Sequence, residues 1–299
     1  MNIIQNKRWF LGVAFLLVGA SLIAVLVFGF RQGIDLRGGT NWQLTILDNT
    51  ANTENIHEAL VSASSSTEIL VRAGEQNKFI VRLHDVSEEA HQSFMRTLTN
   101  RFTGVSEDSF SSIGPAIGSE LRRKSMWAIV AVLLGISLYI AWAFRKVSEP
   151  VRSWKYGIVT LVTLLHDVSI PAGLMAVLGH FKGIEIDTNF IVALLVVMGF
   201  SVHDTIVVFD RIRENLILSR GSTTTLGSTI NRSIKETIAR SINTSLTLII
   251  VLVALIFVGP ASLFYFVLTM LVGTIFGTYS SIFVASPLLH LLEGKKSKG

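Results

Sequence analysis

Long apolar runs separated by short polar segments dominate this chain. Six of the runs are long enough to cross about 30 Å of hydrocarbon as helices. They span Leu11–Phe30, Met126–Phe144, Tyr156–Leu178, Phe190–Phe209, Ile242–Val258 and Leu263–Leu289. The first run has the position of a secretory signal, but its apolar part is too long and no small-x-small cleavage site follows it. We therefore predict a polytopic α-helical membrane protein with six transmembrane helices, the first of which remains as an anchor.

The segment between the first two runs, residues 31–125, has a different pattern. Apolar residues alternate where strands are expected and recur every three or four positions where helices are expected. The predicted elements are strand Trp42–Leu47, helix Thr53–Ala63, strands Glu68–Arg72 and Lys78–Leu83, helix Ser87–Phe102 and strand Asp108–Ile113. Their order, βαββαβ, predicts a ferredoxin-like α+β domain.

Composition and charge agree with a membrane protein. Hydrophobic residues make up 50% of the chain, charged residues 16%, and mean hydropathy is +0.55, a balance that disfavours a soluble enzyme. A net charge of +5 is compatible with nucleic-acid binding, but the basic residues gather beside the apolar runs, so membrane topology explains them better. The chain has no cysteine, which excludes disulfides and thiolate metal sites.

The orientation follows from where lysine and arginine lie. They gather on one side of the predicted membrane, whereas the short loops on the other side carry only Lys182. Because short basic loops stay in the cytoplasm, both termini are predicted to be cytoplasmic. The predicted organisation is the N-terminus with the first helix at 1–30, an extracytoplasmic domain at 31–125, five further helices at 126–289 with a cytoplasmic loop at 210–241, and a basic cytoplasmic tail at 290–299.

Four ionisable side chains interrupt the apolar runs. His166 and Asp167 lie in the third run, and His203 and Asp204 lie in the fourth. A carboxylate inside a bilayer costs roughly 2.5–3.5 kcal/mol on insertion scales, so it is typical of a functional site that faces protein or water. At a rise of 1.5 Å per residue, Asp167 is expected about 16 Å, and Asp204 about 8 Å, from the cytoplasmic end of its run. The two acids are therefore expected at different depths, too far apart to share one proton directly.

Asp204 has a predicted partner at the start of the fifth run. Arg240 precedes this run by two residues and can extend inward along the helix, while Thr244 lies one turn later on the same face. Arginine would favour the charged form of Asp204, and burial would oppose it. Two interpretations follow, a carboxylate that is switched by protonation and a static ion pair that fixes helix packing.

Two regular patterns concern packing. Before the fifth run, isoleucines recur every fourth position, at Ile230, Ile234 and Ile238. This pattern indicates either a cytoplasmic amphipathic helix that continues into the fifth run or a connector that lies on the surface. In the last run, small residues recur every fourth position, at Gly273, Gly277, Ser281 and Ala285. This pattern indicates that another helix, from the same chain or from another subunit, approaches closely there.

The segment Gly33–Thr40 (GIDLRGGT) has the glycine spacing of a phosphate-binding loop. The lysine position of that motif holds Gly39, however, and a strand is expected to follow in place of a helix, so we reject nucleotide binding. No HExxH, GxSxG or metal-spaced His/Cys cluster is present either. We expect neither an enzyme nor a cofactor or metal site.

Four blocks of the sequence resemble the SecF family, the smaller subunits of the SecDF complex in bacterial protein export. The blocks are Gly33–Thr40, His166–Val168, Gly199–Asn215 and Thr278–Leu288. The resemblance implies a resistance–nodulation–division type protein of the bacterial cytoplasmic (inner) membrane. It would pair with SecD, assist SecYEG together with YajC, and use the proton-motive force to promote late translocation and release of an unfolded preprotein.

The resemblance also implies where the ion path lies. The buried acid of the family falls on Asp204, and its basic residue and hydroxyl fall on Arg240 and Thr244. One departure is His203, since many relatives have asparagine there. The imidazole either adds a second titratable group to the path or replaces an amide hydrogen bond.

Two other functions stay open. The chain is either an exporter subunit of the same class for a lipid or small molecule, or a non-transporting subunit that helps to assemble the translocon. The four blocks favour protein export over the first, and the buried acid and base favour it over the second. Proton and sodium both remain as the coupling ion, because carboxylates and hydroxyls suit either. Neither composition nor motifs indicate a nucleic-acid partner; the lipid bilayer is the expected surroundings.

Overall fold

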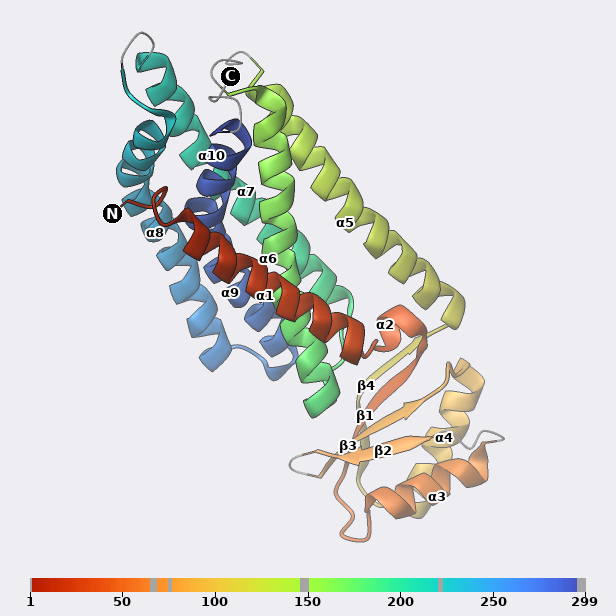
Figure 1. The fold of residues 1–299 in the computed structure, drawn as a ribbon. Coiled ribbons are helices and arrows are strands. Elements are labelled where there is room, and N and C mark those ends of the chain that lie inside the picture. The colour runs from red at the N-terminus through yellow and green to blue at the C-terminus, as the bar shows by residue number, and fades with distance from the viewer. Residues whose placement is uncertain (1, 65–68, 75–76, 146–150, 220–222, 295–299) are drawn as a thin grey trace. The chain divides into compact units, whose positions relative to one another are not determined.

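The computed structural model describes residues 2–64, 69–74, 77–145, 151–219 and 223–294 (Figure 1). The chain divides into two compact units, Gln32–Met126 and a helical unit formed by Met1–Arg31 with Trp127–Gly299. Parts of several predicted features lie outside the described residues. They include the first residue of the predicted strand Glu68–Arg72, residues 220–222 of the predicted loop 210–241, and residues 295–299 of the predicted basic tail.

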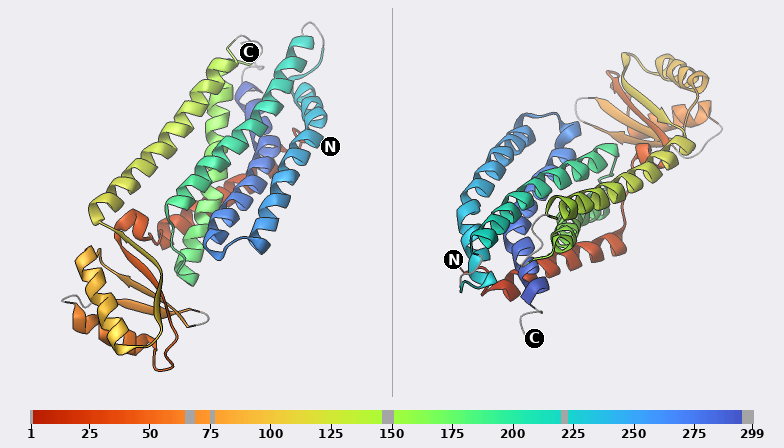
Figure 2. Two further views of the ribbon diagram at one scale, coloured as in Figure 1. Left: turned by 180° about the vertical axis from the view of Figure 1, so that it is seen from behind. Right: turned by 90° about the horizontal axis from the view of Figure 1, so that it is seen from above.

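Within the described residues, six helical stretches are long and apolar enough to cross a membrane, so the predicted polytopic fold is confirmed. Five are single helices: α1 (Lys7–Phe28), α5 (Pro115–Ala143), α6 (Ser153–Lys182), α7 (Thr188–Leu218) and α8 (Leu226–Val258). The sixth is built from the 3₁₀ turn η1 (Ala261–Leu263), α9 (Phe264–Ser280), the π-helix η2 (Ser281–Ala285) and α10 (Ser286–Gly294). Helix α9 packs against α6, α7 and α8, as the views from behind and above also show (Figure 2).

The α7 and α8 helices extend beyond their apolar runs and pack together there. The predicted amphipathic helix forms the first part of α8, which continues unbroken into the fifth run. Ile230 and Ile234 are buried in a hydrophobic core with Phe209 and Ile212 of α7 and Ile3 of the N-terminal segment. The amphipathic segment is therefore part of the core of the helical unit, and the alternative of a surface connector is wrong.

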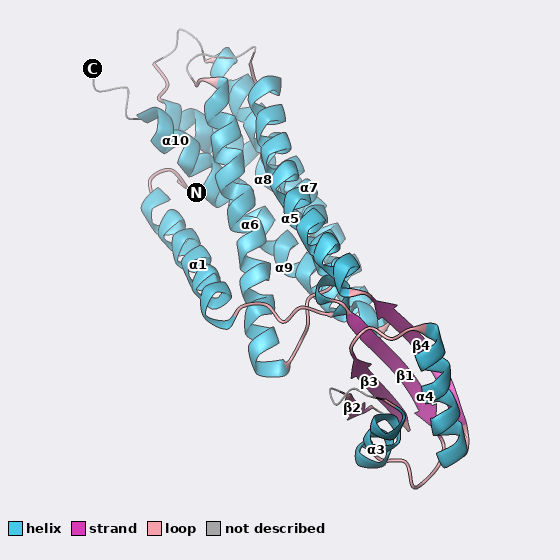
Figure 3. Cartoon of the chain, turned by 90° about the vertical axis from the view of Figure 1, so that its right-hand side faces the viewer, coloured by secondary structure: helices cyan, strands magenta, loops and turns pink. Residues whose placement is uncertain are grey.

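The unit Gln32–Met126 has the predicted ferredoxin-like order. After the single turn α2 (Ile34–Arg37), its elements are β1 (Gly39–Ile46), α3 (Thr53–Ala63), β2 (Leu70–Ala73), β3 (Lys78–Leu83), α4 (Glu88–Arg101) and β4 (Val105–Ile113). The four strands form an antiparallel sheet in the order β2-β3-β1-β4. Trp42, Leu44 and Ile46 alternate along β1 and are buried beneath the paired helices α3 and α4 (Figure 3).

Local sequence signals explain where these elements begin and end. Asn52 and Ser87 precede α3 and α4, and each side chain accepts a hydrogen bond from a backbone N–H of the first turn. At the start of β1 the backbone takes positive φ angles at Gly38 (85°) and Gly39 (128°). Residues with a Cβ rarely adopt such angles, so the two glycines permit the turn between α2 and β1.

The small residues of the last apolar run serve packing within the chain. Gly273, Gly277, Ser281 and Ala285 are all buried. A Cβ added at Gly273 would lie 2.4 Å from Val197 Cγ2 of α7, and one at Gly277 would lie 3.1 Å from Ser201 Cβ. The two glycines therefore let α9 approach α7 closely, which decides between the two packing interpretations in favour of the internal one.

Replacing Gly273 with alanine is expected to destabilise the helical unit by about 1–3 kcal/mol, because a stiff β-branched side chain on α7 occupies the space of the new methyl group. Gly199→Ala on α7 is the matched control, since nothing lies within 4 Å of its added Cβ. Thermal unfolding of the full chain in detergent measures both variants. Equal midpoints for Gly273→Ala and the wild type would contradict the close contact.

Candidate functional site

Asp167 lies at the centre of a buried polar cluster. Its side chain is 0% exposed, and it accepts hydrogen bonds from the hydroxyls of Ser201 on α7 and Ser280 on α9, the second at 2.8 Å. His166 Nδ1 lies 2.8 Å from its other carboxylate oxygen. The His166 ring in turn stacks on Tyr279, with ring centroids 6.2 Å apart. One carboxylate thus joins three helices inside the apolar interior.

Asp204 lies in the same region and is 5% exposed. Its carboxylate accepts a hydrogen bond of 2.5 Å from the hydroxyl of Ser281, the residue directly after the partner of Asp167. Consecutive Cα atoms are about 3.8 Å apart, so the two acids are held from neighbouring positions of one segment. A hydroxyl that donates to a carboxylate makes a short, charge-assisted hydrogen bond, which stabilises these contacts in a low-dielectric interior.

The two acids lie at one level of the bundle, and the expected difference in depth is wrong. Asp167 is the fourteenth residue after Ser153, where α6 begins, and Asp204 is the fourteenth before Leu218, where α7 ends. Helices α6 and α7 are consecutive and run antiparallel (Figure 1). Asp167 therefore lies about 21 Å along α6 from its first residue, and Asp204 lies about 21 Å along α7 from its last residue. The error arose because α7 continues well beyond its apolar run. No direct hydrogen bond joins the two carboxylates among the described contacts, which run through the serines.

A π-helix begins at this point of the chain. The segment Ser281–Ala285 forms η2 between α9 and α10. In regular helix, consecutive side chains point about 100° apart. Ser280 and Ser281 accordingly contact acids on different helices, α6 and α7. π-Helical turns inside α-helices occur frequently at functional sites.

The structure does not bring Arg240 to Asp204. Arg240 and Thr244 lie on the exposed side of α8, and Asp204 is buried against Ser281. Within the described part of the chain, no ion pair joins Arg240 to Asp204, so the predicted pairing is absent here. His203 lies on an exposed face of α7 and takes no part in the cluster. Among the interactions of the described residues, the hydrogen bond between His166 and Asp167 joins two of the six predicted residues.

Sequence reasoning missed the serines that complete the site. Ser201, Ser280 and Ser281 are all at most 1% exposed and hold the two acids. Ser281 had been interpreted only as a small packing residue. The available signal was the position of Ser280 and Ser281 inside an apolar run, in one of the four blocks quoted above.

A second polar cluster joins the last part of α7 to the first part of α8. Glu236 of α8 accepts hydrogen bonds from Arg211 (2.6 Å) and Asn215 (2.7 Å) of α7 and from Arg232 (2.9 Å) one turn away. Asn215 is 1% exposed. These contacts give Arg211 and Asn215, two residues of the block Gly199–Asn215, a structural role in fixing α8 against α7.

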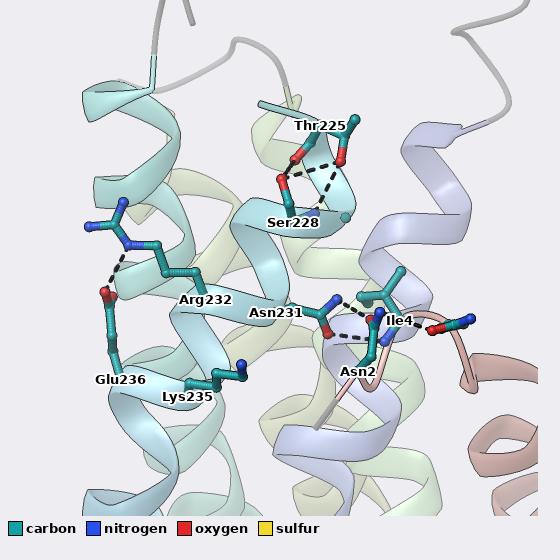
Figure 4. Close-up of a pocket in the computed structure, with 10 residues that line it drawn as sticks. Asn2, Ile4, Thr225, Ser228, Asn231, Arg232, Lys235 and Glu236 are labelled. Carbon is teal, nitrogen blue, oxygen red and sulfur yellow. Dashed lines mark hydrogen bonds and ion pairs between the residues drawn. The ribbon is translucent and has the colours of Figure 1, made fainter. Parts of the chain in front are cut away.

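An open pocket of about 810 Å³ lies beside this cluster, between the N-terminal segment and the start of α8 (Figure 4). Asn231 spans the two segments, donating to Asn2 (2.6 Å) and accepting from the backbone N–H of Ile4 (3.1 Å). None of the six predicted site residues lines the pocket. Over the described residues, no three His, Asp or Glu side chains are grouped closely enough to hold a metal ion.

Comparisons with known proteins agree with the four sequence blocks. Residues 93–295 match the family model described as the C-terminal part of the protein export membrane protein SecD/SecF, and residues 23–45 match the SecD/SecF GG motif. A protein translocase subunit SecF from Thermobaculum terrenum is 41% identical, with 99% of this chain and 95% of that protein aligned. The SecF subunit from Anaerolinea thermophila is 33% identical, with 98% and 94% aligned.

The crystal structure of SecDF from Thermus thermophilus has the same fold, with a TM-score of 0.80 at 32% sequence identity. The match covers 98% of this chain and 39% of the SecDF chain, which is longer. The family match over most of the sequence, the near full-length relatives and the shared fold lead to one conclusion. The chain is a multi-pass membrane protein that belongs to the SecF family of protein translocase subunits.

Proposed function

We propose that the chain acts with a SecD subunit in the bacterial cytoplasmic membrane and uses the proton-motive force to promote late translocation and release of preproteins. In this proposal both termini are cytoplasmic and the α+β domain lies outside. The chain assists the SecYEG channel, with YajC as a further partner, and performs no covalent chemistry of its own.

The observation that carries the proposal is the buried pair of acids. Asp167 and Asp204 lie at one level in the middle of α6 and α7, and each is held by one of two adjacent serines. Ionisable side chains in the middle of a membrane span are costly, and they typically mark an ion path. Two buried polar atoms of the residues next to them, His166 Nε2 and Thr205 Oγ1, have no hydrogen-bond partner among the described residues. Such groups favour a hydrated route to the acids.

The available energy is adequate. One proton that crosses 100 mV releases about 2.3 kcal/mol. Since each 1.4 kcal/mol changes an equilibrium tenfold, this shifts a two-state helix arrangement roughly fifty-fold. Protonation of Asp204 weakens its charge-assisted hydrogen bond to Ser281, so that η2 and the helices beside it can rearrange.

The exposed face of α8 is where we place the SecD subunit. Arg240, Asn243, Thr244 and Thr247 have the i, i+3, i+4, i+7 spacing of one helix face and are all exposed. Polar side chains on an apolar helix are costly towards lipid and stabilise contacts between membrane helices. A SecDF chain exists in Thermus thermophilus, where the part similar to this chain covers 39% of the whole. Arg240 and Thr244 would therefore contribute to the ion path from the subunit interface.

The proposal is tested with inverted membrane vesicles that hold SecYEG and SecD, with and without this chain. Release of a preprotein is measured with a proton gradient, after an ionophore has collapsed it, and with a sodium gradient in its place. The expected result is release that requires both the chain and the proton gradient. Release that depends on the chain but not on any gradient would indicate an assembly subunit and contradict the proposal.

A further inference from the structure

The hydroxyls of Ser280 and Ser281 each face two acceptors, one of which is a buried carboxylate. The hydroxyl of Ser280 lies 2.8 Å from the Asp167 carboxylate and 3.0 Å from the backbone carbonyl of Gly277. The hydroxyl of Ser281 lies 2.5 Å from the Asp204 carboxylate and 2.9 Å from the backbone carbonyl of Thr278. Both serines are 0% exposed, so water does not compete at these positions.

A serine hydroxyl carries one proton and can also accept. It can therefore donate to only one of its two acceptors at a time. When the acid is ionised, donation to the carboxylate is stronger, because the acceptor is charged. When the acid takes up a proton, its own O–H can donate to the serine oxygen, and the serine O–H then turns to the backbone carbonyl. In both protonation states the serine and the acid therefore keep a hydrogen bond to each other.

We propose that Ser280 and Ser281 form a two-position hydroxyl switch that couples Asp167 and Asp204, so that the two acids gain and lose protons as a linked pair. This inference rests on the proposed proton-driven function and assigns positioning residues to it. Each switching step adds one proton to a carboxylate and rotates one hydroxyl. The hydrogen bond that the carboxylate loses as an acceptor is replaced by one that it makes as a donor.

The position of the pair on the chain supplies the coupling. The two serines are consecutive, and the π-helix η2 starts at the second of them. If protonation of one acid shifts this segment, the shift also changes the hydrogen-bond geometry between the second serine and its acid. Gly277 and Gly273, one and two turns earlier, keep α9 close enough to α7 for these contacts to form. Thr278 extends the contacts to α8, because its hydroxyl donates to Ser245 at 2.6 Å.

Few other charges act on the two acids. On α6 the neighbouring titratable group is His166, and on α9 it is Tyr279, which stacks on the His166 ring. On α7 the nearest is His203, which is exposed, and on α8 it is Arg240, also exposed. From Ser241 to Val258, α8 contains no charged residue, and neither does α1 from Phe10 to Phe28. The serine hydroxyls are therefore the principal groups whose hydrogen bonds differ between the charged and the protonated form of each acid.

The test measures gradient-dependent preprotein release against pH for Ser280→Ala, Ser281→Ala and the double variant, in the complete complex. Loss of a hydrogen bond to a charged acceptor changes an equilibrium roughly tenfold or more. Each single variant is thus expected to move the pH of half-maximal release upward by about one unit, because the charged acid loses more than the protonated one. Ser281→Thr keeps a hydroxyl and is expected to restore the wild-type profile.

The matched control is Ser137→Ala on α5, a buried serine whose hydroxyl donates only to its own helix, at Leu133 O (2.8 Å). Linked acids predict that the shift in the double variant differs from the sum of the single shifts. Additive shifts, or profiles that match the Ser137→Ala control, would overturn the switch. If Asp204→Asn still abolishes gradient dependence in that case, the proposed function stands and only the switch fails. If Asp204→Asn has no effect, the function itself fails.

Discussion

Replacing Asp204 with asparagine is expected to abolish the gradient-dependent part of preprotein release and to leave the chain folded. Asparagine has nearly the same shape and can still accept a hydrogen bond from Ser281, which lies 2.5 Å from the carboxylate in the wild type. It cannot take up a proton at physiological pH, so the step that the gradient drives is lost. The measurement is release from vesicles that contain the complete complex, with and without an imposed proton gradient.

The control for this variant is Asp108→Asn in the α+β domain. Asp108 is an exposed carboxylate that also accepts a hydroxyl hydrogen bond, from Thr45 at 2.8 Å. The same chemical change there is expected to leave gradient-dependent release unchanged. Comparable amounts of both variants in the membrane are required for the comparison. An Asp204→Asn complex that responds to the gradient like the wild type would rule out Asp204 as the coupling group.

Truncating Trp42 to alanine is expected to cost the α+β domain about 3–5 kcal/mol of stability, the usual loss for a large aromatic side chain in a core. Trp42 is 0% exposed and lies on β1, the strand paired with both β3 and β4. Its indole Nε1 donates to Glu107 Oε2 at 2.7 Å, and its ring meets Phe110 edge-on. The change therefore removes a large packing volume and one hydrogen bond together.

Hydrogen exchange of the backbone amides in β1 and β3, followed in the full chain at increasing urea concentration, measures this loss. Leu47→Ala is the matched control, because Leu47 directly follows β1 but is 65% exposed. Trp42→Ala is expected to lower the urea concentration at which β1 loses protection, whereas Leu47→Ala should change it little. Equal protection in both variants would show that Trp42 does not support the sheet.

Much of the fold follows from local periodicity. Helix Thr53–Ala63 and strand Lys78–Leu83 have the predicted bounds, because apolar spacing and flanking caps act within a few residues. The six spans were found for the same reason, although α7 continues to Leu218. That extension depends on tertiary contacts, such as the burial of Ile212 and Asn215 against α8. The apolar run alone does not predict these contacts.

The candidate site was only half predictable. Asp167 and Asp204 were conspicuous, because charge inside an apolar run is costly. Two of their three serine partners, Ser280 and Ser281, lie more than seventy residues from the acids that they contact, and a buried serine leaves little trace in hydropathy. The pairing of Arg240 with Asp204 assumed that two neighbouring helices turn these side chains towards each other. In the structure α8 turns Ser241 and Ser245 inward and leaves Arg240 and Thr244 exposed.

The most direct test of proton-driven export measures proton flow and preprotein release in the same vesicles. A pH-sensitive dye in the vesicle lumen reports the protons, and protease protection reports the preprotein. The predicted result is proton movement that starts with release in the wild-type complex and is absent with Asp204→Asn. Wild-type release at the full rate without any accompanying proton movement would contradict the role of the buried acids as the coupling site.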